Sequence, residues 1–519
     1  MQHIIPTILL LLLCCCNTKQ QTEPKQGFLS IESSCFVDEQ GREVILNGIN
    51  HVNKNPEEGH INKDDEKLFP QFKKWGFNFI RYGINWAHLE PQPGVINEAY
   101  LKEIDKRVAW AQENNLWLML DMHQDLYGIK YGNGAPLWAC LDEELPHVKG
   151  DVWSDSYLIS PAVQKAFDSF WENKPASDGI GIQDHYINCW TVIAKRYASS
   201  PSVAGFDVMN EPFMGSEATT VFPKLLEGYA MAAYQKDGTV LQEKELMRLF
   251  ENEESRVEVL ASLNDKQMYA TLLTPAKNIV DNFEQGNLSR FYQKLRNAIR
   301  QHSKQQIIFL EHNYFCNLGI KSTFRIPINK DGTTDNLCAY APHGYDLVTD
   351  TEGAANPGEN RVAFIFEQIF KSAKERDLAT VVGEWGAFYM GENIYYRPAK
   401  QLIELFEEHL AGQTYWAYWN KIETQDYFQK LLARTYPQFV NGKIKQYGNN
   451  FEDNSFQLEW TEDGKSELPT RIYINNLAQI KQISVLPKAS YKQEQYPESQ
   501  AGYIDIEAQK GNRRVTITF

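Results

Sequence analysis

The sequence lacks the cysteine and histidine patterns that bind zinc, and it lacks a glycine fingerprint for a nucleotide. Eight cysteines occur in 519 residues, and they form no CxxC or Cys/His cluster. No GxGxxG opens a predicted helix, which argues against a dinucleotide-binding fold. Basic residues are also fewer than acidic residues. The formal net charge of −15 argues against a nucleic-acid partner and against charge-driven binding to anionic membranes. We expect neither a cofactor nor a metal.

The N-terminal apolar run, residues 4–13, is too short to span a membrane as a mature helix, but it has the length of a signal-peptide core. It ends in Cys14, Cys15 and Cys16, as in a bacterial lipoprotein signal, although no Lys or Arg precedes it. We expect residues 1–16 to be a signal peptide and residues 17–27 a tether. The protein is then exported and held at a bacterial membrane by a lipid. Plain secretion and an uncleaved anchor are the alternatives.

Five cysteines remain after the signal, and their number is odd. Export permits a disulfide among them, but the sequence does not pair them, and buried free thiols are the alternative. They are Cys35, Cys140, Cys189, Cys316 and Cys338.

Eight apolar, strand-like runs alternate with amphipathic helices over most of the chain. The strand-like runs are 45–51, 77–84, 116–122, 203–209, 307–311, 338–343, 380–384 and 414–419. Clear helical periodicity occurs at 97–114, 183–197, 361–376 and 398–410. Near-continuous apolar strands indicate a parallel sheet covered by helices, and eight of them can close. We therefore predict a (β/α)8 TIM barrel over residues 28–440; an open doubly wound sheet is the alternative.

Two insertions and a change of pattern interrupt this repeat. Residues 124–182 and 213–288 follow the third and fourth strands, at the catalytic face of such a barrel, although surface decoration is an alternative. Residues 36–46 read as a hairpin, and 421–445 as connective or helical. Residues 441–519 are predicted to form a small antiparallel β-sandwich. Its expected strands are 455–460, 470–475, 482–486, 503–508 and 514–519.

Glu211 and Glu384 each close an apolar strand, the fourth and the seventh. Asn210-Glu211-Pro212 and Gly383-Glu384-Trp385 are out of place within strands and must lie at their ends. In a barrel both carboxylates point into one mouth. A pair of carboxyl groups, one protonated and one ionised, is the equipment for cleaving a glycosidic bond.

Other strand ends add polar and aromatic groups at the same face. An arginine there keeps a nearby glutamate ionised, histidines and an amide bind sugar hydroxyls, and tryptophans stack on sugar rings. The residues concerned are Arg81, Asp121, His123, Asn210, His343, Tyr345, Trp416 and Trp419.

Asn210-Glu211-Pro212, with Glu384 on a later strand, resembles glycoside hydrolase family 5, and the barrel followed by a sandwich agrees. That resemblance implies that Glu211 is the acid/base and Glu384 the nucleophile. More narrowly, the sequence is similar to endoglycoceramidases in the motifs Asn53-Lys54, Asp121 to Asp125, Gly132 to Pro136 and Phe167 to Trp171. This implies that Lys54, Asp121, His123, Asn210, Tyr345 and Trp416 or Trp419 hold the sugar nearest the bond, with Trp171 a further candidate.

The resemblance implies a two-step, retaining cleavage of the β-bond between an oligosaccharide and ceramide. We also expect apolar residues of the two insertions to form a lipid-facing wall beside the cleft. One alternative is a family 5 enzyme that acts on glucosylceramide, a steryl glucoside or a soluble β-glucan or mannan. Another is a surface lipoprotein that binds glycan or lipid without catalysis.

Overall fold

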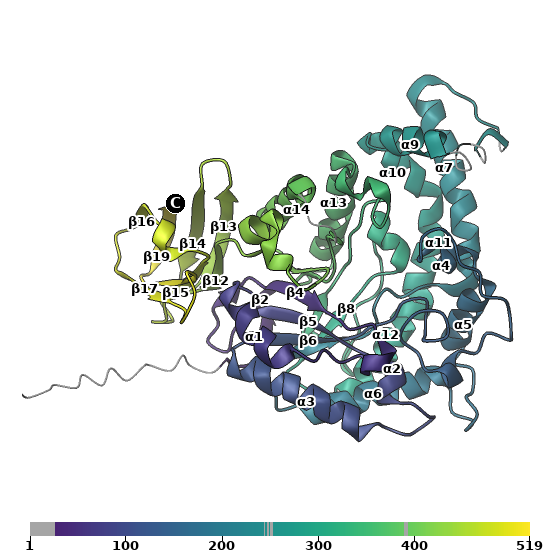
Figure 1. The fold of residues 1–519 in the computed structure, drawn as a ribbon, viewed down its shortest axis with the longest axis horizontal. Helices are drawn as coiled ribbons and strands as arrows, with labels where there is room; N and C mark the ends of the chain where they lie inside the picture. Colours follow the sequence, from purple (N-terminus) through teal and green to yellow (C-terminus); the bar gives the residue numbers. More distant parts are fainter. Residues whose placement is uncertain (1–25, 243, 247–248, 250–252, 389–392) are drawn as a thin grey trace, which may run out of the picture.

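The computed structural model describes residues 26–519 except 243, 247–248, 250–252 and 389–392 (Figure 1). The predicted signal peptide, and all but the end of the predicted tether, lie outside the described residues. No helix in the described part of the chain combines the length and apolarity needed to cross a bilayer.

Eight parallel strands form the central sheet, in the order β10-β11-β4-β5-β6-β7-β8-β9. They are β4 (Asn47–His51), β5 (Phe79–Ile84), β6 (Trp117–Met122), β7 (Val203–Asp207), β8 (Ile307–Leu310), β9 (Cys338–Tyr340), β10 (Val381–Val382) and β11 (Gly412–Tyr415). Parallel bridges Tyr340–Thr380 and His343–Glu384 join β9 to β10 and close the ring. The predicted TIM barrel is confirmed, and the open sheet is excluded.

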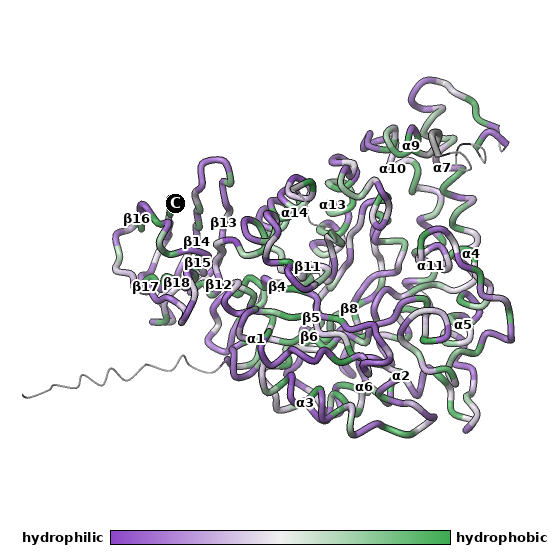
Figure 2. The backbone as a smooth tube through the Cα atoms, viewed as in Figure 1, coloured by the Kyte–Doolittle hydropathy of each residue, from purple (hydrophilic) through white to green (hydrophobic). Residues whose placement is uncertain are grey.

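Helices cover the outside of the barrel, where their apolar faces pack against the strands (Figure 1). The main ones are α1 (Asp65–Lys74), α3 (Glu98–Glu113), α6 (Ile182–Tyr197), α12 (Ser289–Ile299), α13 (Glu359–Glu375) and α14 (Tyr396–Glu408). The α3 helix begins where the Asn97 side chain accepts hydrogen bonds from the N–H groups of Ala99 and Tyr100. Its Leu101, Ile104 and Ala111 are buried, as the helical spacing predicts. In Figure 2, hydrophilic and hydrophobic colours alternate along α3, as expected for a helix with one face on the barrel.

The first insertion is mostly loop with two short helices, and the second is mostly helical. Residues 124–182 contain α4 (Asp155–Ile159) and α5 (Pro161–Trp171), which pack beside the barrel. Residues 213–288 contain α7 (Val221–Asp237), α9 (Glu253–Ser262), α10 (Lys266–Leu273) and α11 (Lys277–Phe283). Figure 1 shows α7, α9 and α10 projecting together from one end of the molecule.

Two antiparallel sheets make the C-terminal sandwich, and the N-terminal hairpin joins one of them. The first has the order β1-β2-β3-β12-β15-β18-β17 and the second β13-β14-β19-β16. The strands are β1 (Ser30–Glu32), β2 (Cys35–Val37), β3 (Glu43–Val44), β12 (Tyr436–Val440), β13 (Lys443–Asn450), β14 (Ser455–Glu462), β15 (Thr470–Ile474), β16 (Gln482–Leu486), β17 (Tyr491–Gln495), β18 (Gly502–Ile506) and β19 (Gly511–Thr518).

The predicted strands of the sandwich are present, but the boundary at residue 441 differs from the strand pairing. The β12 strand lies before that boundary and pairs with β15 and β3, so this sheet contains residues assigned by sequence to the barrel or its connection. The stretch 421–445, expected to be connective or helical, is helical only up to Leu432 before β12 begins.

The barrel and the sandwich are held together by buried polar contacts. Tyr436 Oη donates to the Gly76 carbonyl at 2.7 Å, and Tyr473 Oη donates to the Lys74 carbonyl at 2.9 Å. Glu407 of α14 accepts a hydrogen bond from Arg434 Nε at 2.6 Å. All five described cysteines are free thiols, and four of them are buried.

Candidate active site

The catalytic-face cavity lies at the carboxyl ends of the barrel strands and measures about 220 Å³. Glu211 and Glu384 both line it. Each follows a short buried strand, β7 or β10, so the closed ring brings together residues far apart in sequence. A larger cleft of about 800 Å³ lies between barrel and sandwich, but neither glutamate lines it.

Glu211 and Glu384 approach each other closely across the cavity. A carboxylate oxygen of each lies within 4.8 Å of the other's, with a ring nitrogen of His343 within the same distance of both. Separations of roughly 5–5.5 Å belong to retaining glycosidases, and about 6.5–9.5 Å to inverting ones. This approach of the nearest oxygens lies below the inverting range and favours retaining geometry, in which a carboxylate attacks the sugar directly.

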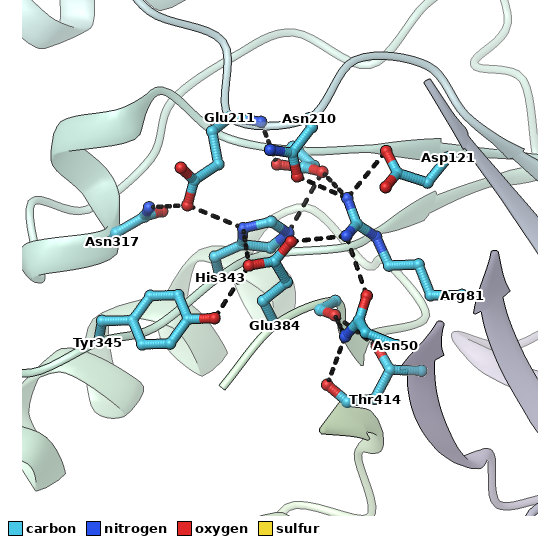
Figure 3. Close-up of polar contacts among 12 residues, drawn as sticks. Asn50, Arg81, Asp121, Asn210, Glu211, Asn317, His343, Tyr345, Glu384 and Thr414 are labelled. Atoms are coloured by element: carbon cyan, nitrogen blue, oxygen red, sulfur yellow. Dashed lines mark hydrogen bonds and ion pairs between the residues drawn. The ribbon is translucent and has the colours of Figure 1, made fainter. Parts of the chain in front are cut away.

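Glu384 is held by two donors (Figure 3). Arg81 Nη1 donates to its Oε1 at 2.6 Å, and Tyr345 Oη donates to its Oε2 at 2.9 Å. Burial raises the pKa of Glu384, while the positive charges of His343 and Arg81 lower it. The two donors favour the ionised form, which is the form that can attack carbon.

Glu211 is held by a different pair of donors (Figure 3). Asn317 Nδ2 donates to Glu211 Oε1 at 2.7 Å, and His343 Nδ1 lies 3.0 Å from the same oxygen. No arginine contact is described for this carboxyl group. The two carboxyl groups therefore have different partners: Glu384 is bound by a guanidinium and a phenol, and Glu211 by an amide and an imidazole.

Arg81 is the fully buried centre of the polar network behind the cavity. Its Nε donates to Asp207 Oδ2 at 2.7 Å, and its Nη2 donates to Asn210 Oδ1 at 2.8 Å and Glu311 Oε1 at 2.9 Å. The same Nη2 lies 3.1 Å from Asp121 Oδ1. Burial and the neighbouring Glu311 raise the pKa of Asp207 well above its usual range. Arg81 therefore positions Glu384 and Asn210 from the buried side of the cavity wall.

The opposite wall of the cavity carries His123, Trp416 and Lys54. The His123 and Trp416 rings stack with centroids 5.1 Å apart. Lys54 Nζ lies 4.6 Å from the centre of the Trp416 ring and 2.8 Å from Asp125 Oδ2. Burial opposes a charge on His123, but the carboxylates of Asp121 and Asp125 raise its pKa to about 9. His123 Nε2 is buried without a hydrogen bond, so this wall offers a polar atom to a ligand hydroxyl.

The structure separates the predicted sugar-holding residues into two layers. Lys54, His123, Asn210, Tyr345 and Trp416 line the cavity. Arg81, Asp121 and His343 have no exposed surface and do not line it, so in place of the predicted substrate contact they hold other side chains. Asp121 Oδ2, for example, pairs with His123 Nδ1 at 2.8 Å.

Two predicted residues lie elsewhere. Trp171 Nε1 donates to the Phe213 carbonyl at 2.8 Å, and its ring packs edge-on against Phe283 and Phe291. Trp419 packs against the barrel core, and neither tryptophan lines the cavity. The sequence could not decide between Trp416 and Trp419, and the structure favours Trp416.

Several functional positions were missed from the sequence. Glu311 directly follows β8, the same signal that drew attention to Glu211 and Glu384, so it could have been found. Asn317 lies in the short 3-10 helix Tyr314–Leu318, where no sequence pattern marks it. Asn50, whose Oδ1 accepts from Arg81 Nη1 at 3.0 Å, lies inside β4 (Asn47–His51), where no sequence pattern marks it.

Two groups of side chains have the spacing of a metal site, but their chemistry does not fit one. Asp121, Asp207 and Glu311 surround Arg81, whose guanidinium already supplies the positive charge. In the other group, His343 joins Glu211 and Glu384. Although burial opposes it, the nearby carboxylates raise the pKa of His343 well above its usual range. A protonated imidazole donates hydrogen bonds and cannot bind a metal.

Comparisons with known proteins agree on one family. The profile described as cellulase (glycosyl hydrolase family 5) matches residues 37–422, and the glycoside hydrolase family 5 C-terminal domain matches residues 434–518. Endoglycoceramidase I of Rhodococcus hoagii is 23% identical over 86% of this chain and 80% of its own. Endoglycoceramidase of Hydra vulgaris is 30% identical over 36% of this chain and 41% of its own. The structure of endo-glycoceramidase II from Rhodococcus sp. with ganglioside GM3 has a TM-score of 0.70 at 23% identity, covering 93% of this chain and 98% of that chain.

Proposed function

Because the chain belongs to glycosyl hydrolase family 5, we propose that it is a retaining endoglycoceramidase, which releases an intact oligosaccharide and ceramide from a glycosphingolipid. The observation that carries the retaining mechanism is the approach of the Glu211 and Glu384 carboxylates to within 4.8 Å. The substrate class rests on the relatives, since endoglycoceramidases from Rhodococcus hoagii and Hydra vulgaris are among them.

In the first step, ionised Glu384 attacks the anomeric carbon of the sugar next to ceramide. Protonated Glu211 gives its proton to the glycosidic oxygen as the carbon–oxygen bond breaks, so ceramide leaves as a neutral alcohol. A covalent glycosyl ester remains on Glu384. Arg81 and Tyr345 align the attacking carboxylate, and His343 and Asn317 orient the proton donor.

In the second step, water takes the place that ceramide has left. Glu211, now ionised, removes a proton from the water as its oxygen attacks the anomeric carbon. The ester bond to Glu384 breaks, the carboxylate is restored and Glu211 is again protonated. Two inversions at one carbon give net retention, and the sugar leaves as the β anomer.

The wall formed by Lys54, His123 and Trp416 is the proposed site for the sugar nearest the bond. Trp416 lines the cavity with an indole ring, and Lys54 and His123 offer donors to hydroxyl groups. Asn210 and Tyr345 complete this side, next to the attacked carbon. Asn210 is held by Arg81 through its Oδ1 and donates from Nδ2 to the Gln124 carbonyl at 2.9 Å.

Apolar side chains near the proton donor support an apolar leaving group. The 3-10 helix that carries Asn317 also brings Tyr314 and Leu318 to the cavity, and Leu347 lines it from the loop after β9. We expected the two insertions to supply a lipid-facing wall. The 124–182 insertion contributes Asp125, Trp153 and Ser154 to the lining, and the described residues of 213–288 contribute none.

We also propose that the protein is exported and anchored to a bacterial membrane through a lipid on one of Cys14, Cys15 or Cys16. The apolar run and the adjacent cysteines support this assignment. An anchor would keep the cavity near the bilayer that holds glycolipid. Labelling with an alkyne fatty acid is expected to mark the native chain. A variant with all three cysteines changed to serine is expected to take up no label.

A panel of substrates tests the proposed function. Purified protein is incubated with a ganglioside, lactosylceramide, glucosylceramide, a steryl glucoside and a soluble β-glucan. We expect cleavage of the first two, with intact oligosaccharide and ceramide as products. Activity confined to glucosylceramide or the steryl glucoside, or preferential cleavage of the glucan, would replace the proposed substrate. Absence of all activity would favour a glycan- or lipid-binding role.

A further inference from the structure

Glu311 is a buried carboxylate with no exposed surface, located directly after β8. It does not line the catalytic cavity. Both of its oxygens are nevertheless bound to active-site groups. Oε2 accepts the backbone N–H of Glu211 at 2.7 Å, and Oε1 accepts from Arg81 Nη2 at 2.9 Å. His343 Nε2 lies 3.3 Å from Oε1, within ion-pair distance.

The bond to the Glu211 backbone matters because Glu211 has an unfavourable conformation. Its φ is 45°, in the left-handed region that is unfavourable for a residue other than glycine. Such a conformation persists only when the surroundings hold it. Gln124 Nε2 donates to the Glu211 carbonyl at 3.2 Å, and Glu311 receives the N–H on the other side. Hydrogen bonds to both the N–H and the carbonyl group of Glu211 therefore fix the backbone that orients its side chain.

The same carboxylate also fixes the imidazole that binds the Glu211 side chain. His343 has Nε2 beside Glu311 and Nδ1 beside Glu211 Oε1, so the ring bridges the two glutamates. Burial opposes a charge on Glu311, but His343 and Arg81 lower its pKa to about 2. Glu311 is thus anionic at any working pH, and a charged acceptor binds N–H donors more strongly than a neutral one.

We propose that Glu311 is a positioning residue for proton transfer by Glu211: it holds the backbone and the histidine that together aim the acid/base at the glycosidic oxygen. The inference rests on the proposed roles of Glu211 and Glu384, and it does not depend on ceramide as the leaving group. Glu311 touches no substrate. Glu311 reaches Glu384 only through a second residue, Arg81 or His343, whereas it binds the Glu211 backbone directly, so the larger effect falls on proton donation.

The test is the dependence of rate on the leaving group. Aryl β-lactosides with dinitrophenyl, nitrophenyl and phenyl groups need increasing help from the acid, since the phenolate becomes a poorer leaving group. In Glu311→Gln, one carboxylate oxygen is replaced by an NH2 group. The groups that contact Glu311 are donors, so this NH2 group faces a donor and one of the contacts is lost. We compare kcat/KM, which reports the first step alone, because Glu211 is also the base of the second step. We expect kcat/KM for the phenyl lactoside to fall about 100-fold, within the range of general acid catalysis, and that for the dinitrophenyl lactoside to fall less than about threefold.

Two further variants separate positioning from folding. Glu311→Asp keeps the charge but shortens the reach, and it is expected to show a smaller change of the same kind. Glu284→Gln is a matched control. Glu284 is equally buried and accepts the Asn313 N–H at 2.9 Å, yet it does not line the cavity. This control is expected to lower the unfolding temperature without steepening the dependence on the leaving group.

An equal loss of rate for all three lactosides in Glu311→Gln would overturn the proposal, because it would place the effect on Glu384. Unchanged rates would overturn it as well. Retained dinitrophenyl activity serves as the internal check that the variant is folded. If the native protein cleaves aryl lactosides but no glycosphingolipid, the proposed substrate fails while this comparison still stands.

Discussion

Arg81 Nη1 donates to Glu384 Oε1 at 2.6 Å, from a side chain with no exposed surface. The contact joins Arg81, inside β5, to Glu384, just beyond β10, and these two residues are 303 positions apart in the chain. Burial raises the pKa of the Glu384 carboxyl, and this cation opposes that rise. Nucleophilic attack needs the anion, so the buried ion pair serves the reaction as well as the fold.

Tyr345→Phe is predicted to shift the acid limb of the pH profile. The tyrosine hydroxyl donates to Glu384 Oε2 at 2.9 Å, and its loss removes a bond that favours the anion. Activity falls as the pH drops through the pKa of Glu384. A higher pKa therefore moves the acid limb of kcat/KM to higher pH, and kcat falls roughly 10–100-fold. The profile is measured with a soluble aryl lactoside. Tyr491→Phe, an exposed site on β17, is the control, and an acid limb that stays in place argues against this role for Tyr345.

Glu211→Ala is predicted to be rescued by azide. Without the acid/base, the glycosyl ester on Glu384 is hydrolysed slowly because water is no longer activated, and kcat falls about 10²–10⁴-fold. Azide is a strong nucleophile that needs no base, so it restores turnover of the dinitrophenyl lactoside and yields the β-lactosyl azide. The product is identified by NMR. An α-lactosyl azide would instead show that azide has replaced the nucleophile, and it would assign that role to Glu211.

His123 is predicted to link stability to alkaline pH. The folded-state pKa is raised to about 9, against about 6.5 when unfolded. Its contribution is complete below about pH 6.5 and is lost as pH rises through 9, at about 1.4 kcal/mol per pKa unit, or on the order of 3 kcal/mol. Urea unfolding from pH 6 to 10 measures this. The stability difference between the native protein and His123→Gln is expected to shrink over that range; a constant difference contradicts the assignment.

Leu347→Asn is predicted to discriminate between lipid and soluble substrates. A polar group in the proposed aglycone site costs about 1–3 kcal/mol of apolar contact, or roughly 10–100-fold in kcat/KM for lactosylceramide. The aryl lactoside, with its small leaving group, is expected to lose less. Val240→Asn changes an exposed apolar residue of the 213–288 insertion that does not line the cavity, and it serves as the control. Equal losses on both substrates would remove Leu347 from the aglycone site.

The barrel could be predicted because each strand is an apolar run and each helix has its own periodicity. Glu211 and Glu384 could be predicted because carboxylates are out of place at the ends of such strands. The sequence could not show which of the predicted residues line the cavity and which lie behind it and hold other side chains. Arg81, Asp121 and His343 are the residue types that bind sugars, and only the closed ring shows that other side chains surround them.

Two further features could not be predicted because they depend on contacts between segments that are separated in the sequence. Residues 436–440 look like the end of the barrel, but they pair with β3 and β15, which lie far away in sequence on either side. Trp171 lies in an endoglycoceramidase-like motif, and the packing of α5 turns its indole toward Phe283 and Phe291. The local sequence pattern predicts neither the pairing of β12 nor the packing of Trp171, because each depends on which distant segment packs against the residue.

The most direct measurement is proton NMR of the first product released from lactosylceramide. The paired carboxylates and the apolar lining beside Glu211 predict free ceramide together with intact lactose, and the β anomer before mutarotation. Release of galactose or glucose would contradict cleavage at the ceramide bond, and an initial α anomer would contradict the attack by Glu384.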